Sequence, residues 1–504
     1  MEEKETISRR ALLKAMAAGG VAGALGSLAA PAAAEAAEAP EAAEAADNAG
    51  GVEWVATTRK EAWRRPVRGA TVGPFKGWLA MDVMLLEDTR FQTIEGFGAC
   101  FNELGWKALS RMPEPARQAM MRELFAPGVG LNLNLCRMPI GANDFAREWY
   151  SYNETAGDFA MAKFDLARDD QMQVPFIRAA QRQRPDLKLW ASPWSPPTWM
   201  KRNGHYAMAP SFPGAPPNGL EPEQVGTPGQ DMFIQEERYF EAYALYFRKF
   251  VEAYAQRGIK ISAVMPQNEF NSAQPFPSCL WTPRGLARFI PYLGRQMDAL
   301  GVEVFFGTLE RGDPAMFEAV LAQPEAARHI KGIGAQWAGR RAIPFIHHAH
   351  PELRVYQSEQ ECGDGKNDWR FARYTWTLMK DFMRAGANAY MYWNIATPRG
   401  GASTWGWPQN ALVSVDMASG RHTVNPDFHV FKHLSHHVRP GAQRIDTLSI
   451  SGYENLLAFR NPDGRIVVVA QNDMAEPQTL RIAVGTGKLV SATLPADSFN
   501  TLVI

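Results

Sequence analysis

Two short segments of the chain combine carboxylates with amides in a pattern suited to acid–base chemistry. Residues 266–269 read Pro-Gln-Asn-Glu and residues 357–361 read Gln-Ser-Glu-Gln-Glu. Each segment closes a strand-like run, so each would place its acids where a strand of a parallel barrel ends. A pair of carboxylates across such a barrel mouth is what retaining glycoside hydrolysis requires. One carboxylate attacks the anomeric carbon, while the other protonates the leaving oxygen and then activates water.

The two carboxylates would need different pKa values for these roles, so their surroundings must differ. Asn268, beside Glu269, could donate to the 2-hydroxyl of the sugar, a contact that strengthens in the transition state. Spacing alone leaves a plainer alternative open. Glu269 and Glu359 could be ordinary barrel-end acids held in ion pairs.

Eight strand-like runs alternate with helical stretches along most of the chain. The strand-like runs cover residues 92–99, 132–140, 188–194, 262–269, 303–310, 332–337, 353–361 and 388–394. The helical stretches include residues 115–125, 233–257, 284–300 and 369–385. Eightfold alternation predicts a (β/α)8 barrel. The alternative, a doubly wound open sheet, is disfavoured because no glycine-rich phosphate loop follows an early strand.

After residue 439 the chain changes to short alternating runs separated by turns, at residues 456–460, 465–470, 479–484 and 491–494. Residues 485–488, Gly-Thr-Gly-Lys, lack the spacing of a phosphate loop and read as a hairpin turn. The strand-rich residues 51–85 have no barrel partner and could complete an antiparallel sandwich. We therefore expect an α/β fold, with a TIM barrel at residues 86–438. A discontinuous antiparallel β-sandwich would form from both chain ends, residues 51–85 and 439–504.

The first residues of the chain read as an export signal. Arg9 and Arg10 precede an Ala-, Gly- and Leu-rich run that ends in three alanines at residues 32–34. Paired arginines in this setting resemble the twin-arginine signal of bacteria. The alternative is a membrane anchor, for which the run is too weakly apolar. We expect residues 1–34 to direct export to the periplasm or the cell exterior, residues 35–50 to form a flexible Ala/Glu/Pro linker, and no stable membrane anchor.

The charge balance excludes a general nucleic-acid binder. The 504 residues carry 53 Lys+Arg and 53 Asp+Glu, whereas such binders have a basic excess. The four cysteines show no C-x-x-C spacing, which argues against a disulfide scaffold or a zinc finger. His347, His348 and His350 read as a surface run rather than as metal ligands. No residue set suggests a metal, flavin or nucleotide, so we expect no cofactor.

Several longer phrases stand along the chain. They are QTIEGFG at residues 92–98, RMPIGANDF at 137–145, ASPWSPPTWMK at 191–201, QNE at 267–269, SE at 358–359, YWN at 392–394 and FKHLSH at 431–436. Together these phrases resemble glycoside hydrolase family 30. The resemblance runs in order from about residue 85 to residue 504. It implies a (β/α)8 barrel with a β-sandwich built from both chain ends, and a retaining glycosidase.

The resemblance also implies roles for single residues. Glu269 would be the acid/base and Glu359 the nucleophile, because the family phrase is a small hydroxyl residue followed by Glu. Glu361 is the competitor for nucleophile if the strand runs that far. Arg137 resembles the arginine that keeps the nucleophile ionised. The side chains expected at the substrate are Glu103, Arg137, Trp194, Asn268, Gln336, Trp337, Trp393, Asn394 and Asn410.

Within that set, Trp393 would be the platform under the first sugar and Trp194 a stacking residue, whereas Trp190 reads as packing. Asn268 would contact the 2-hydroxyl, and Asn410 falls where glucosylceramidases place a sugar-contacting Asn. Trp405 and Trp407, in the loop after the eighth strand, could line the same cleft.

Two departures from the family pattern bear on the substrate. Glu103 stands where an Asp would grip the distal hydroxyls of the sugar, and has one more methylene. At the sixth strand glucosylceramidases read His-Trp-Tyr, but this chain has Gln336-Trp337-Ala338 and lacks the Tyr hydroxyl. These changes leave the retaining mechanism standing and weaken a glucosylceramide assignment.

The sequence thus predicts an exported retaining β-glycosidase that hydrolyses β-linked glucosides and resembles glucosylceramidases. A β-1,6-glucanase, or another family 30 polysaccharide hydrolase, is the alternative. A catalytically inactive carbohydrate-binding protein is the alternative from another class, disfavoured because both Glu269 and Glu359 are present. The expected partner is a carbohydrate or glycoconjugate substrate.

Overall fold

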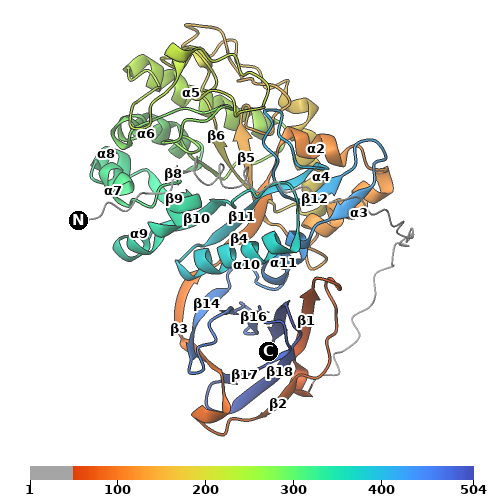
Figure 1. Cartoon of the computed structure of the whole chain (residues 1–504). Helices are drawn as coiled ribbons and strands as arrows, with labels where there is room; N and C mark the ends of the chain where they lie inside the picture. Colours follow the sequence, from red (N-terminus) through yellow and green to blue (C-terminus); the bar gives the residue numbers. More distant parts are fainter. Residues whose placement is uncertain (1–48) are drawn as a thin grey trace, which may run out of the picture. The chain divides into compact units, whose positions relative to one another are not determined.

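The computed structural model describes residues 49–504 (Figure 1). The expected export signal and nearly all of the expected linker lie outside the described residues. No helix within residues 49–504 is long and apolar enough to cross a membrane.

Eight parallel strands close into a barrel. In order around the barrel they are β4 (Gly96–Cys100), β5 (Leu135–Ile140), β6 (Lys188–Pro193), β7 (Ala263–Val264), β8 (Glu303–Leu309), β9 (Ile330–Gln336), β10 (Arg354–Glu359) and β11 (Ala389–Pro398). The barrel closes because β11 pairs in parallel with both β10 and β4. Two further strands, β12 (Ala411–Val415) and β13 (His422–Val424), extend the sheet from β11. The predicted (β/α)8 barrel is confirmed.

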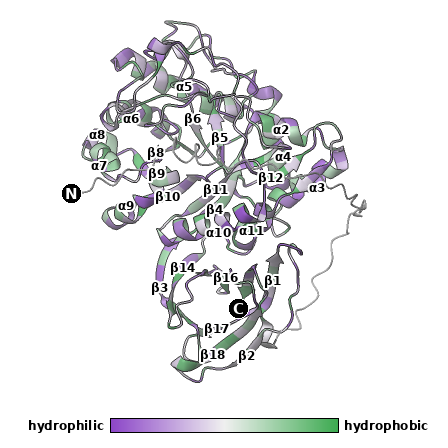
Figure 2. Cartoon of the chain, viewed as in Figure 1, coloured by the Kyte–Doolittle hydropathy of each residue, from purple (hydrophilic) through white to green (hydrophobic). Residues whose placement is uncertain are grey.

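Helices follow most of the barrel strands. They are α2 (Glu103–Leu109), α3 (Glu114–Phe125), α4 (Gln173–Gln183), α5 (Glu237–Gln256), α6 (Pro283–Asp298), α7 (Ala315–Leu321), α8 (Pro324–Ala327), α9 (Ile343–Ala349), α10 (Trp369–Arg384) and α11 (Pro426–Ser435). Several begin at a capping side chain: Asn102, Thr282 and Asp368 each accept the backbone N–H three residues on. Short 3₁₀ turns occur at Ala49–Gly51, Trp78–Ala80, Asp169–Gln171, Thr198–Met200, Pro222–Gln224 and Trp337–Arg341. Hydrophilic and hydrophobic segments alternate along helices such as α5, as amphipathic helices require (Figure 2).

The second sheet is built from both ends of the described chain. Its order is β1-β19-β16-β15-β14-β3-β17-β18-β2. The N-terminal strands are β1 (Glu53–Thr58), β2 (Thr71–Pro74) and β3 (Val83–Thr93). The C-terminal strands are β14 (Gln443–Ser449), β15 (Leu456–Arg460), β16 (Ile466–Asn472), β17 (Gln478–Val484), β18 (Lys488–Leu494) and β19 (Ser498–Val503). The predicted discontinuous β domain is confirmed, and residues 485–487 form the hairpin turn between β17 and β18.

Separate cores support the two parts. The barrel interior is filled by Leu135, Trp190, Ala263, Met265, Phe305, Tyr356, Ala389 and Met391, so Trp190 packs as expected. The sandwich has its own apolar cluster between its strands. His433 of α11 hydrogen-bonds Thr57 of β1 and Thr501 of β19, at 2.9 and 2.8 Å, which ties the last barrel helix to the sandwich.

Candidate active site

Glu269 and Glu359 both stand at carboxyl ends of barrel strands. Glu359 is the last residue of β10. Glu269 follows the short β7, and its φ of 40° lies in the left-handed region. Its backbone N–H donates to Oγ1 of Thr308 at 2.9 Å, which helps to hold this costly conformation. The two residues are only 4% and 6% exposed. Partial desolvation of this kind strengthens every electrostatic contact they make.

One side-chain amide joins the two acids. Nε2 of Gln336 donates to Oε1 of Glu269 at 3.3 Å and to Oε2 of Glu359 at 3.4 Å. Oε1 of Gln336 accepts from Oγ of Ser358 at 2.9 Å and from Nη1 of Arg137 at 3.4 Å, which fixes the orientation of the amide. Both acceptor oxygens bond to the same nitrogen, so the distance between these oxygens cannot exceed the sum of the two hydrogen-bond lengths.

Arg137 organises the Glu359 side of the site. From β5 it donates to Oε2 of Glu359 at 3.1 Å, to the Ser358 carbonyl at 3.1 Å, to Ser192 at 2.8 Å and to Oδ1 of Asn268 at 2.6 Å. Burial lowers its pKa from the ordinary value, and the charge of Glu359 opposes that shift. Arginine stays charged under such conditions. Arg137 is fully buried and reaches the site through the residues it holds, so a contact with substrate stays a prediction.

Aromatic rings surround this guanidinium. It lies 4.5 Å from the ring centre of Trp194, 4.9 Å from that of Trp190 and 5.7 Å from that of Trp393. Trp194 and Trp393 also contact each other, with ring centres 5.4 Å apart. Both are almost fully buried, so little of either face is open to a sugar in the unliganded structure.

More accessible aromatic surface lies beside this cluster. Trp337, Trp405 and Trp407 are half-buried and pack against it. The rings of Trp337 and Trp407 are 6.3 Å apart, and Trp405 stacks on Trp149 at 5.2 Å. These rings offer the apolar faces on which sugar rings can stack.

Asn268 keeps a donor for a ligand. Its Oδ1 accepts from Arg137 and, at 3.2 Å, from the Thr308 hydroxyl. Because its oxygen is held twice, the amide NH₂ is the group turned away from Arg137, and among residues 49–504 it donates to no protein acceptor. It is therefore available to a hydroxyl beside Glu269.

Two protein-family descriptions match the chain, one over the barrel and one over the sandwich. The family description "Glycosyl hydrolase family 30 TIM-barrel domain" matches residues 94–438, and "Glycosyl hydrolase family 30 beta sandwich domain" matches residues 441–502. The chain belongs to glycoside hydrolase family 30. The resemblance seen in the sequence phrases is confirmed, and the protein is a glycoside hydrolase.

Curated proteins similar in sequence to this family 30 chain include some named as glucosylceramidases and some named as endo-1,6-beta-D-glucanases. "Putative glucosylceramidase 1" of Caenorhabditis elegans is 29% identical over 82% of this chain and 81% of its own length. "Lysosomal acid glucosylceramidase" of Mus musculus is 26% identical over 83% and 82%. "Endo-1,6-beta-D-glucanase neg1" of Aspergillus fumigatus is 25% identical over 82% and 85%. The solved structure of SrfJ from Salmonella typhimurium shares the fold, with a TM-score of 0.78 and 22% identity, over 90% of this chain and 98% of that one.

Three residues of this family 30 enzyme that are predicted to bind substrate also make contacts within the protein. Both carboxylate oxygens of Glu103 are taken by Arg147 and Arg168, with ion pairs of 3.1 and 3.3 Å. Asn394 is fully buried and bonded on both sides of its amide, to Asn102 and Gln409. Oδ1 of Asn410 accepts the backbone N–H groups of Gly365 and Asn367, which shapes the loop after β10. Nδ2 of Asn410 has no hydrogen-bond partner among the described residues. The roles of Glu103, Asn394 and Asn410 at the sugar stay predictions.

Glu361 lies off the site, because β10 ends at Glu359. Its carboxylate accepts from the Tyr374 hydroxyl at 2.7 Å and pairs with Arg340 at 3.7 Å. Glu361 therefore does not share the position of Glu359 at the end of β10. Among the described residues no group of three or more His, Cys, Asp or Glu side chains could hold a metal ion.

Sequence reasoning missed three residues that the structure places at or near Glu269 and Glu359. Nε2 of Gln274 donates to Oε2 of Glu269 at 2.8 Å, and Sγ of Cys362 lies 3.6 Å from Oε1 of Glu359. Asp144 is 4% exposed, and its Oδ1 has no hydrogen-bond partner within residues 49–504. Burial raises its pKa to about 7, against the pull of the Gln409 amide. Asp144 lies four residues after β5, inside the phrase at residues 137–145. Its place near the end of a barrel strand could have indicated that it lies close to the site.

Proposed function

We propose that this family 30 hydrolase is a retaining β-glycosidase, with Glu359 as nucleophile and Glu269 as acid/base. The observation that carries the proposal is the single Gln336 nitrogen shared by the two carboxylates. Retaining enzymes hold their carboxyl groups about 5–5.5 Å apart, whereas inverting enzymes need about 6.5–9.5 Å to admit a water. Oxygens bridged by one amide favour the closer spacing.

In the first step Glu359 attacks the anomeric carbon and forms a glycosyl ester, while Glu269 donates a proton to the leaving oxygen. Arg137 supports the ionised nucleophile, because its charge lies 3.1 Å from Oε2. In the second step Glu269 takes a proton from water, which then attacks the same carbon and releases Glu359. The free NH₂ of Asn268 is placed to donate to the 2-hydroxyl during both steps.

The substrate class that we propose is a β-linked glucoside. Two of the relatives described above are named as glucosylceramidases, and they cover most of this chain. A β-1,6-glucan is the second candidate, supported by the glucanase that is 25% identical over 82% of the chain. We also propose export, on the basis of the twin-arginine pattern around Arg9 and Arg10.

A substrate panel combined with two variants tests this function. Hydrolysis by wild type, Glu269→Gln and Glu359→Gln should be measured on each of four substrates: an aryl β-glucoside, glucosylceramide, a β-1,6-glucan and glucuronoxylan. We expect both variants to fold and Glu359→Gln to lose hydrolysis of every substrate. Glu269→Gln should retain partial turnover only of the aryl glucoside, whose leaving group needs little protonation. Unchanged turnover in Glu359→Gln would contradict the assignment.

A further inference from the structure

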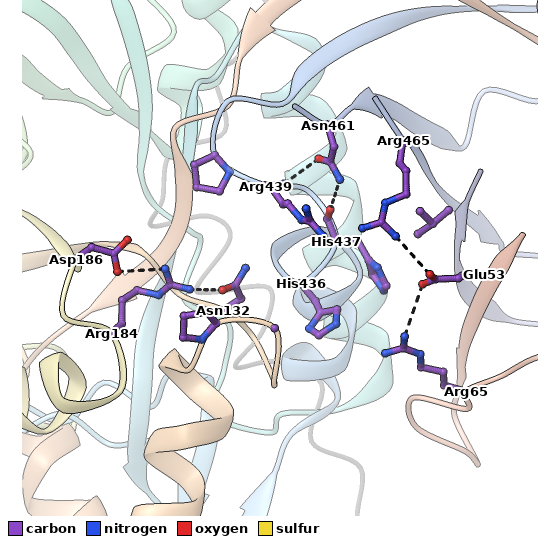
Figure 3. A pocket seen from close by; sticks show the side chains of 14 residues that line it. Glu53, Arg65, Asn132, Arg184, Asp186, His436, His437, Arg439, Asn461 and Arg465 are labelled. Atoms are coloured by element: carbon purple, nitrogen blue, oxygen red, sulfur yellow. Dashed lines mark hydrogen bonds and ion pairs between the residues drawn. The ribbon is translucent and has the colours of Figure 1, made fainter. Parts of the chain in front are cut away.

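A cavity lies between the barrel and the β-sandwich, and Figure 3 shows the side chains that line it. It encloses about 710 Å³. Its lining comes from the loop after α3, the end of α4, the segment after α11, and strands and turns of the sandwich. None of these lining residues belongs to the site around Glu269 and Glu359.

On the sandwich side the cavity carries more guanidinium groups than carboxylates. Glu53 is shared by two arginines, at 3.6 Å from Arg65 and 3.4 Å from Arg465. Asp463, which is not among the lining residues, is shared in the same way by Arg439 at 2.9 Å and Arg465 at 3.1 Å. Three cations therefore face two anions here. Within residues 49–504, Nη2 of Arg439 and of Arg465 donates to no protein acceptor.

On the barrel side Arg184 is a preorganised cation. Its side chain is only 8% exposed and is held by the Phe125 carbonyl at 3.1 Å and by Oδ1 of Asn132. Its carboxylate partner, Asp186, lies 3.5 Å away and is 78% exposed, so water screens that pair. Four arginines, Arg65, Arg184, Arg439 and Arg465, thus stand against three carboxylates, Glu53, Asp186 and Asp463.

Two histidines add polar groups to the same wall. His437 is 9% exposed, stacks on Trp63 with ring centres 5.7 Å apart, and its Nε2 has no partner among the described residues. Nδ1 of His436 bonds the Gly130 carbonyl at 2.8 Å. Burial and nearby cations lower the pKa of His436 to about 4 and that of His437 well below its ordinary value. Both rings are therefore neutral near pH 7, and a neutral ring can still donate one N–H.

We propose that this junction cavity binds an oxyanion, a phosphate or carboxylate group, through Arg65, Arg439 and Arg465. Guanidinium forks match both groups in geometry and charge. An oxyanion would balance the excess charge and take up the free Nη2 donors and the unpaired His437 nitrogen. The cavity volume lies within the range of small-molecule sites, so the oxyanion could be free or carried on a sugar.

Calorimetric titration of the full chain at pH 7 and constant ionic strength tests the proposal. The probes are inorganic phosphate, glucuronate and glucose, each up to 10 mM. Binding of either anion supports the proposal: phosphate alone points to a free oxyanion, and tighter binding of glucuronate points to an acidic sugar. No binding of either anion overturns it, and so does equal binding of neutral glucose.

Variants assign the binding to the cavity. We expect Arg439→Gln and Arg465→Gln to weaken anion binding at least tenfold, and Arg439→Lys to weaken it less because the charge remains. Arg328→Gln, an exposed arginine outside the cavity, should bind as wild type does. Binding unchanged in both cavity Gln variants would overturn the proposal. Hydrolysis by Arg439→Gln should remain at the wild-type rate, so failure here is distinguishable from failure of the proposed catalytic function.

Discussion

The Arg137 guanidinium donates to Oε2 of Glu359 across 3.1 Å, from a strand that is not a neighbour of the strand bearing the acid. Arg137 is completely buried, and Glu359 is nearly so. The pair therefore fixes the position of the proposed nucleophile from across the barrel. A buried charge of this kind is costly to leave alone, and that cost gives a direct test.

Arg137→Met should destabilise the protein, because it leaves Glu359 buried without its cation. We expect the free energy of unfolding to fall by about 3–5 kcal/mol, as for other broken buried pairs. Denaturant unfolding followed by fluorescence measures it. Arg328→Gln is the matched control: it breaks an exposed pair with Glu325 and should cost less than about 1 kcal/mol. Equal losses in the two variants would contradict a buried, supporting role for Arg137.

Gln336→Leu should lower kcat far more than it changes KM. The substitution removes one donor from each carboxylate, and a hydrogen bond to a charged group contributes about 1.5–3 kcal/mol. We therefore expect kcat to fall roughly 10- to 150-fold, measured on an aryl β-glucoside.

Gln336→His is the companion variant. Imidazole titrates with an ordinary pKa of about 6.5, so a new limb should appear in the pH profile of kcat. A wild-type kcat in Gln336→Leu, or a pH profile that Gln336→His leaves unchanged, would show that the amide does not join the two acids.

Asp144 should make stability depend on pH. Burial raises its pKa from 3.8 to about 7 in the folded protein. The folded state then holds a proton that the unfolded state has released, so stability falls as the pH rises from about 4 to about 7 and levels off above. Asp144→Asn should remove this fall, and its amide can still accept from Gln409. Unfolding free energies at pH 4.5, 6 and 7.5 measure the difference, and the exposed Asp88→Asn should keep the wild-type slope.

Glu103→Gln tests whether Glu103 supports the fold or contacts the sugar. Both of its oxygens serve Arg147 and Arg168, so we expect a loss of about 3–5 kcal/mol in unfolding free energy. The value of kcat/KM for an aryl β-glucoside should stay within about threefold of wild type at a temperature where the variant is folded, because no transition-state contact is lost. A hundredfold drop in kcat/KM with unchanged stability would restore Glu103 as a sugar ligand.

Part of the site could be predicted from the sequence. Glu269 ends a strand-like run and Glu359 lies two residues before the end of another. Parallel barrel strands all end at one mouth, so local patterns sufficed to bring the acids together. The shared amide of Gln336 depends on side-chain orientations fixed by Arg137 and Ser358, which lie far away in sequence. No local pattern reports such a contact.

The contacts of Glu103 and Asn394 could not be predicted for the same physical reason. Glu103 begins α2 and Asn394 lies within β11, but their partners Arg147 and Gln409 come from loops whose paths the sequence leaves open. In the sandwich, the sequence does not indicate β14, because most residues of this strand are polar and only Ile445 is fully buried. The sequence does not indicate β19 either, because the polar residues Asn500 and Thr501 interrupt its apolar pattern. Both are buried in the structure, where hydrogen bonds satisfy their side chains.

The stereochemistry of the first product tests the retaining mechanism most directly. Proton NMR during hydrolysis of an aryl β-glucoside distinguishes the two anomers before they interconvert. The proposed double displacement through Glu359 predicts that β-glucose appears first and α-glucose follows by mutarotation. Initial release of α-glucose would contradict it.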